Sequence, residues 1–370
     1  MNKMTIAKCL LLALLPMLLI CTGCHDELDL TADYKDISVS YALLNMNDPV
    51  HYFKIYRGYL TDENAYVEAG NWENIYYPID SIEVRLEEYN DRGTLVRSSV
   101  LDTTTMVPKD DGYFANPKQL LYYSTWTLNK EYRYRLVIKH VNSGEEVYAQ
   151  TDIVGNCRIS KPVNQNPFNS KDNTGPKFVI SGDGGGTAKS NNAAIADFYI
   201  TFNYIEVDKN THEVTHKSIS KKMNSSYKVP QSDGDINFDS FTPSNLFLLI
   251  KQYVEPNNNV VRYIDTIEAK PYFCLKVDAW MANKEFSIYH SVSSPSSSII
   301  QDRLDYTNFV SENNNAYGLL ASRNHCYRLF KFDNTNGNNN EDSLVKGVYT
   351  KGLNFDYYRN SPEFFEVVTK

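Results

Sequence analysis

The chain of 370 residues lacks an excess of positive charge, and it lacks an apolar run long enough to cross a membrane. Asp and Glu number 45 against 37 Lys and Arg, a net charge of −8 that argues against nucleic acid, whose phosphates attract basic surfaces. The apolar run at residues 10–20 has 11 residues, whereas a membrane-spanning helix needs about 20. That run therefore indicates a secretory signal rather than a membrane span.

The features of a leader surround this run. Two lysines precede it and small residues follow it, which predicts a signal peptide at residues 1–23. The Thr-Gly-Cys ending resembles a bacterial lipobox, with Cys21 at the place where leucine is usual. The resemblance implies that Cys24 becomes the first residue and is lipidated. Residues 24–35 would then be a tether.

Cysteine is scarce in the rest of the chain. Only Cys157, Cys274 and Cys326 follow Cys24, and their spacing is not that of a metal site. Three separate buried thiols, or one disulfide with one free thiol, are both compatible with the sequence. We expect no metal and no cofactor.

Tyrosine is abundant, with 28 residues, and the dominant pattern is that of β-strands. Ile37, Val39, Tyr41 and Leu43 alternate with small residues, residues 82–86 alternate apolar and acidic side chains, and residues 131–154 form a hairpin pattern. Short strands at such intervals predict a mostly β fold. Residues 36–156 are expected to be an Ig-like or transthyretin-like sandwich.

The composition changes after this first domain. Residues 157–195 are rich in Asn, Gly, Ser and Pro, which predicts a linker or long loop. Strand patterns resume in residues 196–370, the expected second domain. Thr242-Pro243-Ser244 favours a helix only slightly over a strand in the stretch after it, and residues 283–292 have helical spacing. The second domain is thus expected to be β-rich with one or two short helices.

One short motif matches a catalytic pattern. His212-Glu213-Val214-Thr215-His216 has the H-E-x-x-H form of zinc proteases, which requires both histidines on one helical face. Here the motif follows a turn and leads into a strand, on which residues four apart are separated by about 13 Å. No nucleophile motif is present, so we expect no catalytic residue and no metal site, and a surface hydrolase ranks third among the functions.

The three tryptophans were compared as binding candidates. Trp72 lies in a polar stretch with Tyr76 and Tyr77, which favours a binding loop, because aromatic side chains dominate recognition sites. The alternative, that Trp72 folds back onto the sheet and closes the core, is slightly favoured over the binding loop. Trp126 and Trp280 are expected in the core.

The start of the mature chain and parts of its body carry a resemblance. Cys24-His25-Asp26-Glu27 resembles the surface-export signal of Bacteroidota lipoproteins, with His25, Asp26 and Glu27 as the signal. Residues 36–160 and 270–325 resemble a family of uncharacterised two-domain, β-rich surface lipoproteins of that phylum, through a tyrosine-rich hairpin and a later strand–helix. Members of this family are thought to accompany TonB-dependent outer-membrane transporters.

The resemblance implies a non-catalytic lipoprotein on the cell surface, anchored in the outer membrane and accessory to the capture or uptake of a glycan or peptide. A fimbrial or pilus-type subunit is the alternative. The phylum's O-glycosylation pattern is similar to Asp342-Ser343-Leu344, with Ser343 as the acceptor in a polar loop.

Overall fold

The computed structural model describes residues 36–61, 64–115, 118–171, 175–223, 227–228, 234–238, 241–293, 306–313, 315–335, 337–362 and 364. The predicted signal peptide and tether, with Cys24, His25, Asp26 and Glu27, lie outside these residues. Among the residues described, no helix combines the length and the apolar character that crossing a membrane requires. The prediction of a mostly β fold is confirmed.

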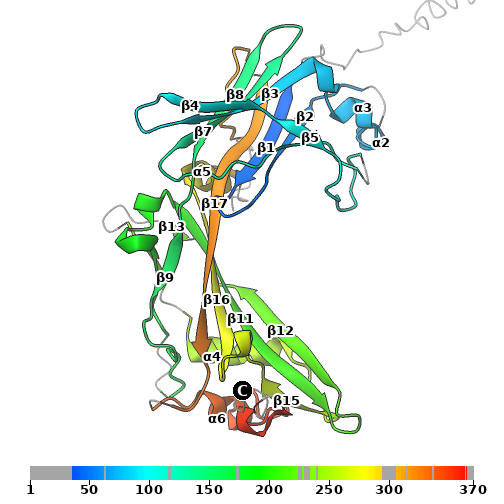
Figure 1. Ribbon diagram of the computed structural model, residues 1–370. Helices are drawn as coiled ribbons and strands as arrows, with labels where there is room; N and C mark the ends of the chain where they lie inside the picture. Colours follow the sequence, from blue (N-terminus) through cyan, green and yellow to red (C-terminus); the bar gives the residue numbers. More distant parts are fainter. Residues whose placement is uncertain are drawn as a thin grey trace, which may run out of the picture.

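One long sheet runs from end to end of the elongated molecule (Figure 1). Its strands follow the order β12-β11-β16-β17-β1-β2-β6-β5, and β13 and β15 also pair with β11. Their bounds are β1 Ser38–Leu44, β2 His51–Arg57, β5 Asp102–Thr104, β6 Leu121–Ser124, β11 Ile195–Asp208, β12 Val214–Lys222, β13 Tyr227–Lys228, β15 Val260–Ile264, β16 Phe273–Ala282 and β17 Ala316–Lys331. We call the part around β1, β2, β5 and β6 the upper half and the part around β11, β12, β15 and β16 the lower half, as they lie in Figure 1.

Strand β17 belongs to both halves. Its first seven residues pair in parallel with β1, and the following residues pair antiparallel with β16. Gly318 lies at φ +124°, and a Cβ at this position would come within 1.8 Å of the Ser40 carbonyl oxygen on β1. Glycine is therefore needed where β17 approaches β1.

A second sheet covers one face of the upper half. It has the order β4-β3-β7-β8, with bounds β3 Ile82–Tyr89, β4 Leu95–Val100, β7 Arg133–His140 and β8 Glu146–Asp152. The alternating residues Val84, Leu86, Leu136 and Ile138 are buried in one core with Phe53 of β2. Two sheets packed face to face make this half a β-sandwich, as the alternation predicts. Two short helices, α2 Ala65–Glu68 and α3 Trp72–Ile75, lie beside it.

The lower half is covered on the same side by shorter pieces. They are the small sheet β14-β10-β9 and two helices, with bounds β9 Cys157–Lys161, β10 Phe178–Gly182, β14 Ile236–Phe238, α4 Pro243–Tyr253 and α6 Asn340–Lys346. The core beneath them is rich in phenylalanine, including Phe168, Phe178, Phe238 and Phe330. The prediction of a linker at residues 157–195 is wrong for this reason: most of its apolar residues are buried in this core, although many polar residues surround them.

The boundary of the second domain also needs correction. The first half of β17 lies within the predicted second domain, residues 196–370, yet it completes the sheet of the upper half. A period-two pattern shows which residues share a face, but it does not show which sheet a strand joins. The two expected helices are present as α4, capped by the Thr242 side chain, and α5 Lys284–Ser293, and α6 is a further helix where a polar loop was expected.

Asparagine side chains fix the chain where it passes from the upper half to the lower. Three of them donate to backbone carbonyls of residues 152–155: Asn192 Nδ2 to Ile153 at 2.9 Å, Asn283 Nδ2 to Asp152 at 3.0 Å and Asn324 Nδ2 to Gly155 at 3.0 Å. Because these donors come from three distant segments, the crossing between the halves is held from several sides.

Candidate binding site

The predicted binding loop does not present its three aromatic residues to solvent. Trp72 is 37 % exposed at the start of α3, but its ring lies 4.2 Å from that of Tyr76. Tyr76 is only 2 % exposed and packs in a small cluster with Ile75. Tyr77 is buried and donates its hydroxyl proton to Asp36 at 2.9 Å. The prediction is wrong for Tyr76 and Tyr77, because apolar contacts beside β2 outweigh the polar sequence around them.

Ser343 does not lie in an exposed loop either. It is half-buried on α6, and its hydroxyl lies 3.1 Å from that of Ser170. The preceding stretch is held down by asparagines: the buried Asn340 donates from Nδ2 to Asn166 Oδ1 at 2.9 Å and to the Phe168 carbonyl at 2.7 Å. Asparagines that hydrogen-bond one another can be buried, which composition alone does not show.

The H-E-x-x-H stretch has the local structure expected of it. His212 lies in a turn with φ +59°, and His216 follows on β12, where its Nδ1 lies 2.9 Å from Asp265 Oδ2. Across the described residues, no three His, Cys, Asp or Glu side chains are grouped as metal ligands.

The three cysteines are free thiols. Cys157 and Cys274 are buried and Cys326 is half-buried. Burial raises the pKa of Cys157 to about 11 and that of Cys326 to about 12. Both are therefore protonated at neutral pH and unsuited to nucleophilic attack.

The opposite face of the long sheet carries several exposed aromatic residues, among them Tyr41, Trp280 and Tyr327. We call it the open face; it bears the odd-numbered residues of β17, while Leu320 and Phe330 point into the two cores. Trp280 on β16 is 41 % exposed there, so its predicted place in the core is wrong. The alternation along β16 already predicts this exposed position. Leu275, Val277 and Ala279 point into the core, so Trp280 lies on the other face.

Strand β1 reverses the expected alternation. Tyr41 is 42 % exposed and Leu43 is exposed beside it, whereas Ser38 and Ser40 are buried. The buried Ser38 hydroxyl lies 3.0 Å from the Tyr77 hydroxyl and 3.1 Å from His140 Nε2. Small residues thus face the crowded interior of the sandwich, and the larger ones face outward.

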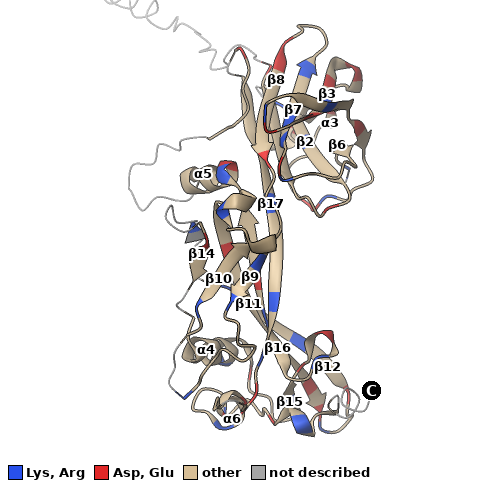
Figure 2. Ribbon diagram, turned by 60° about the vertical axis from the view of Figure 1, so that its left-hand side comes forward, with Lys and Arg blue, Asp and Glu red and all other residues tan. Residues whose placement is uncertain are grey.

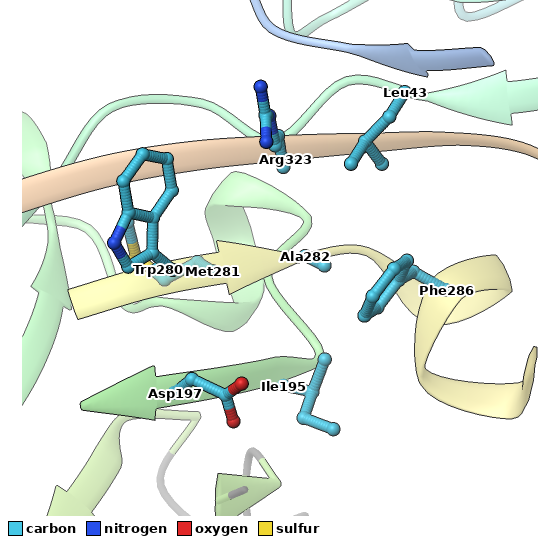
Figure 3. Close-up of a pocket in the computed structure, with 8 residues that line it drawn as sticks. All are labelled: Leu43, Ile195, Asp197, Trp280, Met281, Ala282, Phe286 and Arg323. Atoms are coloured by element: carbon cyan, nitrogen blue, oxygen red, sulfur yellow. The ribbon is translucent and has the colours of Figure 1, made fainter. Parts of the chain in front are cut away.

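A row of stacked side chains stands on the lower part of the open face. The Trp280 and His325 rings lie 4.2 Å apart at 28°, and the His325 and Tyr327 rings lie 6.2 Å apart at 21°. On the other side of the row, the Arg323 guanidinium is 5.6 Å from the Trp280 ring. Figure 3 shows Arg323 beside Trp280, on the neighbouring strand.

Two adjacent cavities open beside this row. The smaller, of 180 Å³, is lined by Leu43, Ile195, Asp197, Trp280, Met281, Ala282, Phe286 and Arg323 (Figure 3). The larger, of 490 Å³, is lined by Tyr41, Ala42, Leu43, Tyr52, Lys54, Gln119, Leu121, Phe286, Tyr289 and Leu319. Because Leu43 and Phe286 line both, the two cavities form one concave site where the halves meet, beside α5. Aromatic walls with a few polar groups are typical of a ligand site.

Two carboxylates near Trp280 are paired with basic side chains. Asp197 Oδ2 accepts a hydrogen bond from Lys222 Nζ at 2.7 Å. Burial alone would raise the pKa of Asp278, but hydrogen bonds from His325 and Lys276 outweigh it and hold that pKa below its ordinary value. A glycosidase needs one carboxylic acid that stays protonated, and the lowered pKa of Asp278 does not suit that role.

No protein-family model matches the chain, and no curated protein is significantly similar to it in sequence.

Proposed function

We propose that the chain is a non-catalytic lipoprotein of the bacterial cell surface that binds an oligosaccharide at the concave site of its open face. The observation that carries this proposal is the exposed Trp280, held between Arg323 and His325 at the wall of a cavity. Sugar rings offer C–H groups to aromatic side chains and hydroxyls to charged ones. The site supplies both kinds of partner.

The position of the site within the sheet favours a sugar over a peptide. Extended peptides commonly bind by adding a strand to a free sheet edge. At Trp280, β16 is paired with β11 on one side and with β17 on the other, so its backbone groups there are already used. A ligand here meets side chains only, and sugar hydroxyls are suited to such contacts.

The cellular setting is proposed from the start of the chain. Lipidation of Cys24 would anchor the protein in the outer membrane, and His25, Asp26 and Glu27 would direct it to the cell surface. A TonB-dependent outer-membrane transporter is the proposed partner, and the lipoprotein would hold the glycan for uptake.

The binding site is tested with Trp280→Ala. Affinity electrophoresis through gels containing a panel of polysaccharides should retard the unaltered protein, and the substitution should weaken the retarding interaction about ten-fold or more, as expected for an aromatic anchor. Trp72→Ala is the matched control, because Trp72 is similarly exposed but lies outside both cavities. Equal retardation of the Trp280 variant and the unaltered protein would contradict the proposal.

The anchor is tested separately with Cys24→Ala. The unaltered protein should sediment with outer membranes, and the variant should leave the membrane fraction because it has no residue to acylate. Mass spectrometry of the first mature peptide gives the lipid directly. An unacylated peptide from the membrane-bound protein would refute the lipid anchor and leave the sugar-binding proposal unaffected.

A further inference from the structure

The side chains that line the two cavities carry more positive than negative charge. Asp197 is paired with Lys222, so it contributes little net charge. Arg323 in the smaller cavity and Lys54 in the larger one form no ion pair within the described residues. The concave site is thus a positive spot on a chain whose net charge is −8.

We propose that the ligand of this site is an anionic oligosaccharide, whose acidic groups bind Arg323 in one cavity and Lys54 in the other. This inference rests on the proposed function and names the class of sugar. The guanidinium of arginine offers paired N–H donors that match carboxylate and sulfate groups.

The geometry around Arg323 suits this role. Its guanidinium lies against the Trp280 ring at 5.6 Å, which orients the planar group without neutralising its charge. On the smaller cavity's wall, Leu43 and Phe286 provide the apolar surface opposite. An acidic sugar could pack on these apolar side chains while its acidic group meets Arg323.

A second basic group reinforces Lys54. Lys109 lies near Lys54. Burial is the main cause of the lowered pKa of Lys109, and the positive charge of Lys54 lowers this pKa further. Lys109 itself donates to the carbonyls of Phe114 and Ala115 at 3.1 Å. No carboxylate lines the larger cavity, and Asp102, which shares the open face on edge strand β5, lines neither cavity. An anion bound at Lys54 would relieve the repulsion between the two ammonium groups.

The two basic positions also set a minimum length for the ligand. Lys54 is opposite Tyr41 on β1, which is opposite Leu319 on β17, and Arg323 lies four residues further along β17. Two strand spacings and four residues put the two Cα atoms about 16 Å apart. A single sugar cannot reach both, so binding should strengthen with chain length until the ligand spans this separation.

The test uses an array of immobilised oligosaccharides that includes uronate-bearing, sialate-bearing, sulfated and neutral chains of two to eight units. The unaltered protein should bind acidic chains and not neutral ones. The kind of acidic chain that it binds shows whether the recognised group is a carboxylate or a sulfate. Arg323→Gln and Lys54→Gln should each weaken binding about ten-fold or more, since each removes a charged hydrogen-bond donor. Raising NaCl from 50 to 500 mM should weaken the binding of acidic chains more for the unaltered protein than for either variant, because salt screens the lost charge interaction.

Arg92→Gln is the matched control, because Arg92 is an exposed cation in the turn before β4. Circular dichroism and thermal melting verify that each variant is folded. If neutral chains bind and Arg323→Gln binds them equally well, the charge proposal fails while the sugar-binding function stands. If no chain binds, both proposals fail together.

Discussion

The upper and lower halves share one sheet but are covered by layers of different origin. The upper cover consists of two hairpins, β3–β4 in residues 82–100 and β7–β8 in residues 133–152, which pair with each other in one small sheet. The lower cover is assembled from residues 157–182, 236–253 and 340–346. Each half of the upper cover is a local hairpin, whereas the described residues of the lower cover form no such hairpin and depend on contacts between distant segments.

The most severe way to break both halves is Gly318→Val. The new side chain would meet the Ser40 carbonyl of β1, and the φ of +124° is unfavourable for valine, so the loss in free energy of unfolding should exceed about 4 kcal/mol. Soluble yield and circular dichroism measure the outcome. Gly112→Ala should be neutral, since nothing lies within 4 Å of its Cβ. A folded Gly318→Val protein would show that the close approach of β17 to β1 is not needed for a stable fold.

Two substitutions on β17 test whether the halves unfold together. Phe330→Ala empties part of the lower core at a cost of about 3–5 kcal/mol, and Leu320→Ala does so in the upper core at about 2–5 kcal/mol. Because β17 and the asparagines at the crossing join the halves, urea unfolding should remain one transition in each variant. Two transitions, with only one shifted by each substitution, would show that the halves are independent.

The lower cover's dependence on buried asparagines is tested with Asn340→Ala. The Asn166 side-chain oxygen and the Phe168 carbonyl would lose their donor in a buried place, which should cost about 2–3 kcal/mol in free energy of unfolding. Asn313→Ala is the control, because Asn313 is exposed and bonds only to the Glu145 side chain among the described residues. Equal effects of the two substitutions in urea denaturation would contradict this role.

A smaller effect of opposite sign is expected for Glu341→Gln. Burial raises the pKa of Glu341 above its ordinary value of 4.5, although the Tyr358 N–H and Arg359 offset part of the shift. The fold thus favours the protonated acid, and this stability is fully present below pH 4.5 and declines as pH rises through the higher folded-state pKa. Glutamine retains the acceptor for Tyr358 N–H without a charge to bury.

The gain from Glu341→Gln should therefore appear above pH 5 and reach about 1–3 °C in melting temperature at pH 7. Thermal melts from pH 4 to pH 8 measure it. A difference that does not change with pH would mean that Glu341 is not the titrating group.

The upper cover could be predicted from sequence because its information is local. The alternation at residues 82–86 and the hairpin at 131–154 identify both the strands and their buried faces. The lower cover could not be predicted, because Phe168 lies among polar residues and the partners of the short apolar run at residues 178–180 are distant in sequence. Asn340 shows the same limit: its burial depends on Asn166, far from it in the chain.

The candidate site was missed for two different reasons. Trp280 was assigned to the core from its residue type, although the phase of its own strand places it outside. Tyr41 and Leu43 could not be placed by phase, because either face of β1 could have been the buried one. Only the packing of Ser38 against Tyr77 and His140 decides between them.

The parallel pairing of β1 with β17 has a mechanical consequence. The chain enters β1 at Ser38, at the end of the molecule opposite the lower half, and β17 runs the same way toward its end at Lys331. A pull between residue 36 and the lower half acts along both strands in shear (Figures 1 and 2). In this shear geometry, the hydrogen bonds of all seven residue pairs bear the load together, so they must break at the same time rather than in sequence.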